Sequence, residues 1–98
     1  MSCLQGYIHT EIQSIFDVVG EPKFPNGDGE KVDIEWEIEI NGKTLTIYNY
    51  KDGKNYNGED GLEVEEITEW HIGGDGNIKA EIEELAKRLG NKEFQHLR

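Results

Sequence analysis

Four carboxylates alternate with apolar residues between positions 32 and 40, forming the densest set of chemically active side chains in the sequence. The run reads VDIEWEIEI, and its acidic residues are Asp33, Glu35, Glu37 and Glu39. Strand side chains point alternately to the two faces, so all four carboxylates are expected on one face. Paired carboxylates serve acid/base catalysis when burial separates their pKa values, and an open row lacks that burial. The pattern therefore favours binding of cations or of a basic protein.

A second set of candidate side chains is mostly aromatic and lies among asparagines. It comprises Tyr48, Tyr50, Lys54, Tyr56, Trp70 and His71. Tyrosine and tryptophan are enriched among the anchors of protein interfaces. Three interpretations remain open: Tyr48 and Tyr50 anchor a partner beside the carboxylates, the whole set binds a nucleotide by stacking, or the rings shield the sheet edge while Trp70 completes the core.

The sequence lacks the usual signatures of catalysis and metal binding. His9, His71 and His96 are far apart, and no HxxxH or CxxC pattern occurs. The single cysteine, Cys3, and the two serines have no obvious base to activate them. We therefore predict a protein that is not an enzyme and uses no metal and no cofactor.

Negative charge is concentrated in the middle of the chain. The net charge is −11, and residues 28–69 hold 13 acidic residues against four lysines. Glu63, Glu65 and Glu69 extend the acidic set beyond the alternating run. Such a field repels nucleic acid and anionic lipid and attracts basic proteins. We expect a cytoplasmic protein with no direct contact to nucleic acid or membrane, since no apolar run approaches the ~20 residues of a membrane span.

The alternating run also predicts a β-hairpin. Asn41-Gly42 is typical of a two-residue type I′ turn, because both positions require positive φ. The strands are expected over 32–40 and 43–50, with Trp36 opposite Ile47 and the carboxylates opposite threonine and tyrosine hydroxyls. A third strand is expected within 63–72, where a bulge near Glu66 would bring Ile67 into phase with the other apolar residues.

Two helices are expected from their capping and stop signals. Residues 10–13 match a capping box formed by a threonine and a glutamine, which predicts a helix over 10–19. A second helix is expected over 78–89, with Asn77 or Asp75 as N-cap and Gly90 as its stop. Residues 20–31 and 51–62 are rich in glycine and asparagine and are expected to be loops.

These elements predict a single α+β domain over residues 1–98. The expected architecture is a two-layer sandwich in α-β-β-β-α order, with a three-stranded antiparallel sheet and two helices on one face. The helices would cover the Trp36 side, which leaves the carboxylate face bare.

Several strings of the chain resemble small acidic proteins encoded by bacteriophages. They are GYIHTEI, FDVVGEP, VDIEWEIEI, TIYNYKDGKNY and ITEWHIGG, in that order, within residues 6–75. The resemblance implies a viral protein made in the cytoplasm of a bacterial host. It implies no catalytic residues. Small acidic proteins of this kind often block a host defence or DNA-handling enzyme by occupying its nucleic-acid site.

The leading hypothesis is a non-enzymatic binding protein that acts as a nucleic-acid mimic. Its partner would be a basic or nucleic-acid-binding host protein, contacted through Asp33, Glu35, Glu37, Glu39, Tyr48, Tyr50, Glu65 and Glu69. One alternative is a sponge for a nucleotide signal, built from Tyr48, Tyr50, Lys54, Tyr56, Trp70 and His71. Another is a solvated face that only keeps the sheet from aggregating. A homodimer also stays open.

Overall fold

The structure, a computed structural model, describes residues 3–97 and has an α+β fold, as expected. One antiparallel sheet contains β1 (Cys3–His9), β2 (Glu35–Ile40), β3 (Lys43–Tyr48), β4 (Glu69–Gly74) and β5 (Glu93–His96), in the order β2-β3-β4-β1-β5. The helices are α1 (Ile12–Val19), α2 (Lys54–Asn57) and α3 (Lys79–Arg88). Two short 3₁₀ turns, Gly58–Asp60 and Val64–Glu66, complete the described elements.

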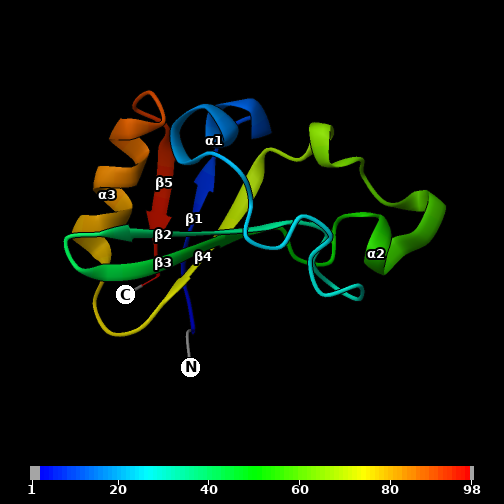
Figure 1. Ribbon diagram of the computed structural model, residues 1–98, viewed down its shortest axis with the longest axis horizontal. Helices are drawn as coiled ribbons and strands as arrows, with labels where there is room; N and C mark the ends of the chain where they lie inside the picture. The colour runs from blue at the N-terminus through cyan, green and yellow to red at the C-terminus, as the bar shows by residue number, and fades with distance from the viewer. Residues whose placement is uncertain (1–2, 98) are drawn as a thin grey trace.

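The helices α1 and α3 lie on the same side of the sheet, while α2 lies at the far end of the molecule (Figure 1). Both α1 and α3 contribute buried residues to one core, which they share with the inward side chains of the sheet. The five strands twist strongly, so the β2–β3 hairpin runs across the direction of β1 and β5 in this view (Figure 1). We call the sheet face opposite these two helices the open face.

The expectation of a three-stranded sheet was wrong, because the chain adds a strand near each end. β1 precedes the first helix and β5 follows the last one, and they pair side by side. β5 is only four residues long, and β1 is interrupted by a register shift between Leu4 and Gly6. Neither segment therefore shows the long apolar alternation that identifies a strand in sequence. The helix α2, within the expected loop 51–62, also changes the predicted element order.

The predicted hairpin and its register are confirmed. Trp36 lies opposite Ile47, Glu37 lies opposite Thr46, and the turn residues Asn41 and Gly42 have φ values of 55° and 75°. The first strand begins at Glu35 rather than at position 32. Before it, backbone N–H groups bond to the side chain of Asn49 instead of to a neighbouring strand.

Two local predictions were wrong. No capping box forms at residues 10–13, because α1 begins at Ile12 and Gln13 bonds to Asp17 at 2.9 Å. A capping box forms instead between Glu63 and Glu66, at the 3₁₀ turn that takes the place of the expected bulge. The turn returns Ile67 to the core without a bulge in the strand, since β4 starts only at Glu69.

The second helix ends as predicted, but its N-cap is Ile78 rather than Asn77 or Asp75. α3 ends before Gly90, whose φ is 104° and whose N–H bonds to the Lys87 carbonyl. At its start, the Asn77 side chain accepts the N–H of Lys79 at 3.1 Å. This contact satisfies one of the backbone donors that a helix N-terminus leaves free.

The centre of the core is a pair of tryptophans that hold both ends of α1. Trp36 and Trp70 are fully buried and meet edge to face, with ring centroids 5.6 Å apart. The indole N–H of Trp70 donates to the carbonyl of Thr10 at 3.0 Å, just before α1. That of Trp36 donates to the carbonyl of Gly20 at 2.9 Å, just after it. Burial of each ring is therefore coupled to the position of the helix.

Replacing Trp36 with phenylalanine should lower the free energy of unfolding by about 2 kcal/mol. The change keeps an aromatic ring but leaves the Gly20 carbonyl without its donor, and such losses cost about 1–3 kcal/mol. Urea denaturation measures the effect. The control is Tyr56→Phe at a half-exposed ring, which should change stability by less than about 0.5 kcal/mol. Equal midpoints for Trp36→Phe and wild type would contradict the assigned role.

Candidate functional site: the open face of the sheet

A row of polar and aromatic side chains crosses the open face from one edge of the sheet to the other. In the strand register, Glu35 lies opposite Tyr48, Tyr48 opposite His71, His71 opposite Tyr7, and Tyr7 opposite Gln95. Neighbouring strands are about 4.8 Å apart, so the row spans about 19 Å. The alternate positions on these strands, such as Trp36, Ile47 and Ile8, are buried in the core.

The middle of this row is an aromatic cluster around His71. Its ring lies 4.9 Å from that of Tyr7, 5.4 Å from that of Tyr48 and 5.6 Å from that of Tyr50, between ring centroids. With Leu4, these four residues line a hollow of about 480 Å³, which we call the aromatic hollow. Gly73 allows Thr46 to pack closely beside the hollow's Tyr48, because a Cβ at this position would lie 2.6 Å from the Thr46 hydroxyl oxygen.

Burial favours the neutral form of the His71 imidazole. Partial burial lowers its pKa below 6.5, although Glu69 and Asp52 act in the opposite direction. Its Nδ1 atom is buried and has no hydrogen-bond partner among residues 3–97. The aromatic hollow therefore presents rings and a neutral imidazole rather than a positive charge.

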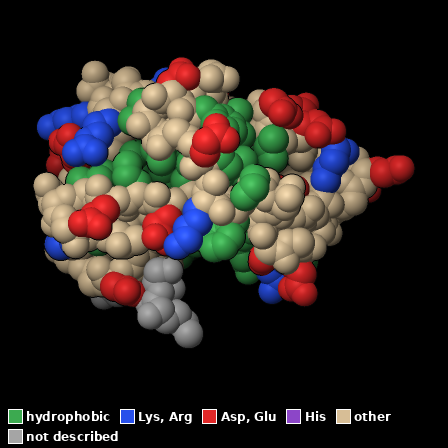
Figure 2. All heavy atoms as spheres, viewed as in Figure 1, with side chains coloured by type: hydrophobic (Ala, Val, Ile, Leu, Met, Phe, Trp, Pro, Cys, Tyr) green, Lys and Arg blue, Asp and Glu red, His purple; other side chains and the backbone are tan. Residues whose placement is uncertain are grey.

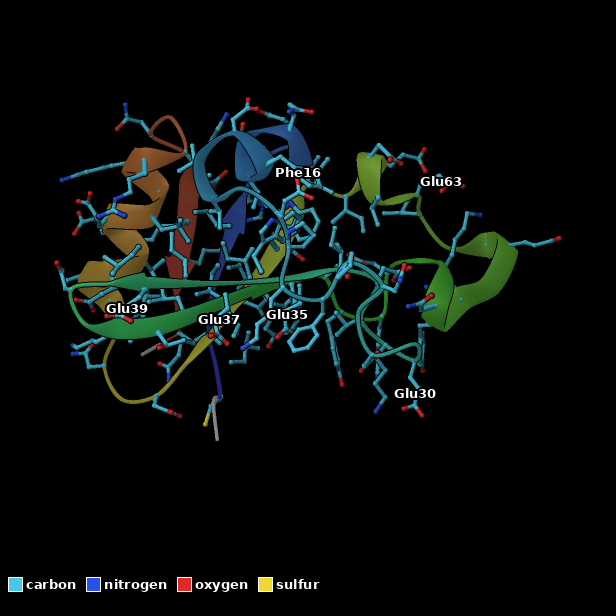
Figure 3. All side chains as sticks on the ribbon, viewed as in Figure 1. Phe16, Glu30, Glu35, Glu37, Glu39 and Glu63 are labelled. Carbon is cyan, nitrogen blue, oxygen red and sulfur yellow. The ribbon has the colours of Figure 1, made fainter. Side chains whose placement is uncertain are left out.

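Three of the predicted carboxylates form a row along β2. Glu35, Glu37 and Glu39 lie on the side of the hairpin away from Phe16, which packs on Trp36 in the core (Figure 3). The ammonium group of Lys23 lies 3.1 Å from the Glu37 carboxylate and offsets part of its charge. We call these three residues the acidic row.

Glu35 is the most perturbed member of the acidic row. Half-burial raises the pKa of its carboxyl group, and Glu37 and Asp28 raise it further, while Lys23 opposes them. On its other side Phe24 pairs with it through two backbone hydrogen bonds of 3.0 Å. Burial likewise raises the pKa of the neighbouring Tyr48, and the charge of Glu35 adds to the effect.

Asp33 does not continue the acidic row, because its carboxylate is bound inside a loop network. Asn49, fully buried, donates to Asp33 at 2.9 Å and to Asp52 at 2.9 Å, and accepts the N–H groups of Asp33 and Ile34. The other carboxylate oxygen of Asp33 accepts the N–H of Asn55 at 3.1 Å. The Asp33 carboxylate therefore links the loop before β2 to the segment that follows β3.

The remaining predicted residues are dispersed. Glu69 lies on β4 opposite His9, next to the aromatic cluster, whereas Glu65 lies in the 3₁₀ turn Val64–Glu66. Figure 2 shows acidic side chains separated by other groups, with lysine and arginine among them, on one side of the molecule. The carboxylates on that side therefore form several small groups.

The residues predicted to bind a nucleotide do not form one group in the structure. Tyr48, Tyr50 and His71 share the aromatic hollow, but Trp70 is fully buried in the core. Tyr56 lies on α2, and Lys54 lies 3.5 Å from the carboxylate of Glu63. Lys51 contacts Tyr50 and Tyr56, with its nitrogen 5.4 and 5.3 Å from their ring centroids.

Sequence reasoning missed Tyr7, Leu4 and Phe24 as surface residues of this site. Tyr7 and His9 flank the buried Ile8, so the alternation of Tyr-Ile-His was the signal available for β1. It is only three residues long and precedes a helix. Phe24 lies in a loop, and only its backbone pairing with Glu35 places it beside the sheet.

Neither a metal-binding group nor a membrane span is found among residues 3–97. No cluster of three or more histidine, cysteine or acidic side chains has a geometry that would hold a metal ion in that range. Likewise, none of the described helices has the length and apolar character needed to cross a membrane. Comparison with known proteins gave no matching family model, curated protein or solved structure.

Replacing Glu35 with glutamine should stabilise the protein at pH 7. The folded state holds the Glu35 proton more tightly than the unfolded chain, so ionisation costs stability as the pH rises above its ordinary pKa of 4.5. We expect a gain of about 0.5 kcal/mol, typical of relieving like charges on a sheet face. The gain should disappear below about pH 4, where both states are protonated.

Urea denaturation at a series of pH values measures this effect, with Glu39→Gln at an exposed position of the same strand as the control. A gain that persists at low pH would show that the amide stabilises the fold for another reason.

Replacing Asn49 with aspartate should destabilise the protein by about 3 kcal/mol at pH 7, since it removes two donors and brings a third carboxylate against Asp33 and Asp52. Part of the loss should return on acidification, when the carboxylates are protonated. Denaturation at pH 7 and pH 4 measures both effects. The control, Asn91→Asp at an exposed site, should cost less than about 0.5 kcal/mol.

Proposed function

We propose that this chain is a non-enzymatic binding protein whose open face docks on a basic surface of a nucleic-acid-binding protein. One observation carries the proposal: the acidic row lies at the edge of an exposed aromatic cluster, on the sheet face that α1 and α3 leave uncovered. Aromatic side chains supply interface area, and neighbouring carboxylates select positively charged partners.

The perturbed state of Glu35 supports a role in binding. The raised pKa of Glu35 means that its charged form reduces stability at neutral pH. Glutamine or lysine at this position would keep the face polar without that cost, so solubility alone does not explain the glutamate. Functional sites commonly retain groups that reduce stability. A basic partner would lower this cost, since a cation beside Glu35 favours its charged form.

The mimicry of nucleic acid is limited to a short stretch. Side chains on one face of a strand are about 6.8 Å apart, whereas each DNA strand carries one charge per about 3.4 Å. Glu37 is also partly neutralised by Lys23. The acidic row therefore suits two or three basic side chains of a nucleic-acid site rather than a long channel.

The bacterial setting of the proposal comes from the resemblance to bacteriophage proteins. We propose that the partner is a host defence or DNA-handling protein and that binding inhibits it by covering its nucleic-acid site. The nucleotide-sponge alternative receives less support, because Trp70 is buried and the charges of nearby carboxylates act on Tyr48 and His71.

Reversing charge in the acidic row should abolish partner capture. Immobilised protein would be exposed to bacterial lysate as wild type and as the double variant Glu35→Lys, Glu37→Lys. The matched control is Glu59→Lys, Glu83→Lys, at exposed positions outside the sheet. Each change adds two charges, so both variants go from −11 to −7.

We expect wild type and control to recover the same nucleic-acid-binding proteins, with at least a tenfold lower recovery by the acidic-row variant. Added duplex DNA should release the captured proteins, because it competes for the same basic groups. Equal recovery by all three proteins, or capture that DNA does not affect, would contradict the proposal.

A further inference from the structure

Three tyrosine rings and one imidazole line the aromatic hollow. Tyr48 and Tyr50 are tilted against His71 by 31° and 53°, and Tyr7 meets it nearly edge-on at 73°, so the rings face different directions. The volume of about 480 Å³ falls within the ~300–1,000 Å³ of small-ligand pockets. Several ring faces around a hollow attract cations, because each face carries partial negative charge.

Carboxylates near the aromatic hollow add to this attraction. Glu35 is the cross-strand neighbour of Tyr48 and its charge raises the pKa of that phenol. Glu69 and Asp52 act in the same sense on His71. The neutral His71 contributes no opposing charge.

The chain already places one of its own cations on this cluster. The Lys51 nitrogen lies 5.4 Å from the ring centroid of Tyr50, so one ring of the aromatic hollow already holds a positive group. Tyr56, which Lys51 also contacts, lies outside the hollow. Tyr7, Tyr48 and His71 line the rest of the aromatic hollow. These rings suit a planar guanidinium, which stacks on aromatic faces and bonds a carboxylate with two parallel donors. A compact ammonium group also contacts ring faces, but it lacks the planar fork of two parallel donors.

We propose that the aromatic hollow binds the guanidinium group of an arginine on the partner protein, stacked on Tyr48 and paired with Glu35. This inference rests on the proposed function and assigns one residue type of the partner to one place on the open face. Arginine is frequent in nucleic-acid-binding surfaces, where it contacts phosphate and bases.

Nuclear magnetic resonance titration with acetyl-arginine-amide tests the assignment. We expect saturable shifts of the ring signals of Tyr7, Tyr48 and His71. Acetyl-citrulline-amide, which has nearly the same shape but no charge, and acetyl-lysine-amide should each bind at least five times more weakly. Tyr48→Leu should weaken arginine binding about tenfold, whereas Tyr56→Leu, at a ring outside the aromatic hollow, should leave it unchanged. The amide spectrum of each variant reports whether it is folded.

Several results would overturn the inference. They are absence of saturable shifts with arginine, equal binding of citrulline or lysine, and an unchanged affinity in folded Tyr48→Leu. Preferential binding of adenosine monophosphate at the same rings would overturn it in favour of a nucleotide site. Its failure is distinguishable from failure of the proposed function: if Tyr48→Leu still captures the partner and the acidic-row variant does not, the carboxylates act without the aromatic hollow.

Discussion

Trp36 and Trp70 come from strands that are separated by β3, and their contact fixes how the helical layer sits on the sheet. Because their indole N–H groups reach carbonyls at opposite ends of α1, the helix cannot slide without leaving a buried carbonyl unpaired. This arrangement commits the large apolar side chains of β2 and β4 to one face of the sheet. The opposite face is then left to their sequence neighbours, which are Glu35, Glu37, Glu69 and His71.

The composition of this face is therefore a consequence of the same alternation that builds the core. A side chain on the open face can change without disturbing Trp36 or Ile47, since successive residues point in opposite directions. Burial of the Tyr48 and His71 rings in their own cluster is only partial. Side chains of the open face are therefore separate from the core, apart from Glu35, whose pKa is raised by burial and then by its acidic neighbours.

The turn and register of the hairpin were predictable to the residue, because Asn41-Gly42 and the strict period of two specify both, but the ends of its strands were not. The strands β1 and β5 were not predictable, because they pair with each other, and β1 with β4, over a large sequence separation. The candidate site likewise contains residues that local sequence could place and residues that only long-range strand pairing could place. Glu35, Glu37 and Glu39 could be placed on one face from sequence, but the position of Tyr7 beside His71 depends on that long-range pairing. Asp33 was misplaced because the Asn49 side chain replaces strand pairing at the start of β2.

The network around Asn49 has a consequence for how the sequence can diverge. The loop before β2 and the loop after β3 are joined there, and Asn55 adds hydrogen bonds to the carbonyls of Asn26 and Val32. Gly27 packs so closely on Val32 that any side chain at this position would collide with the backbone. Neither loop can be exchanged or lengthened alone, so compensating substitutions should occur in pairs between them. An evolutionary record of such a chain would show the two loops changing together.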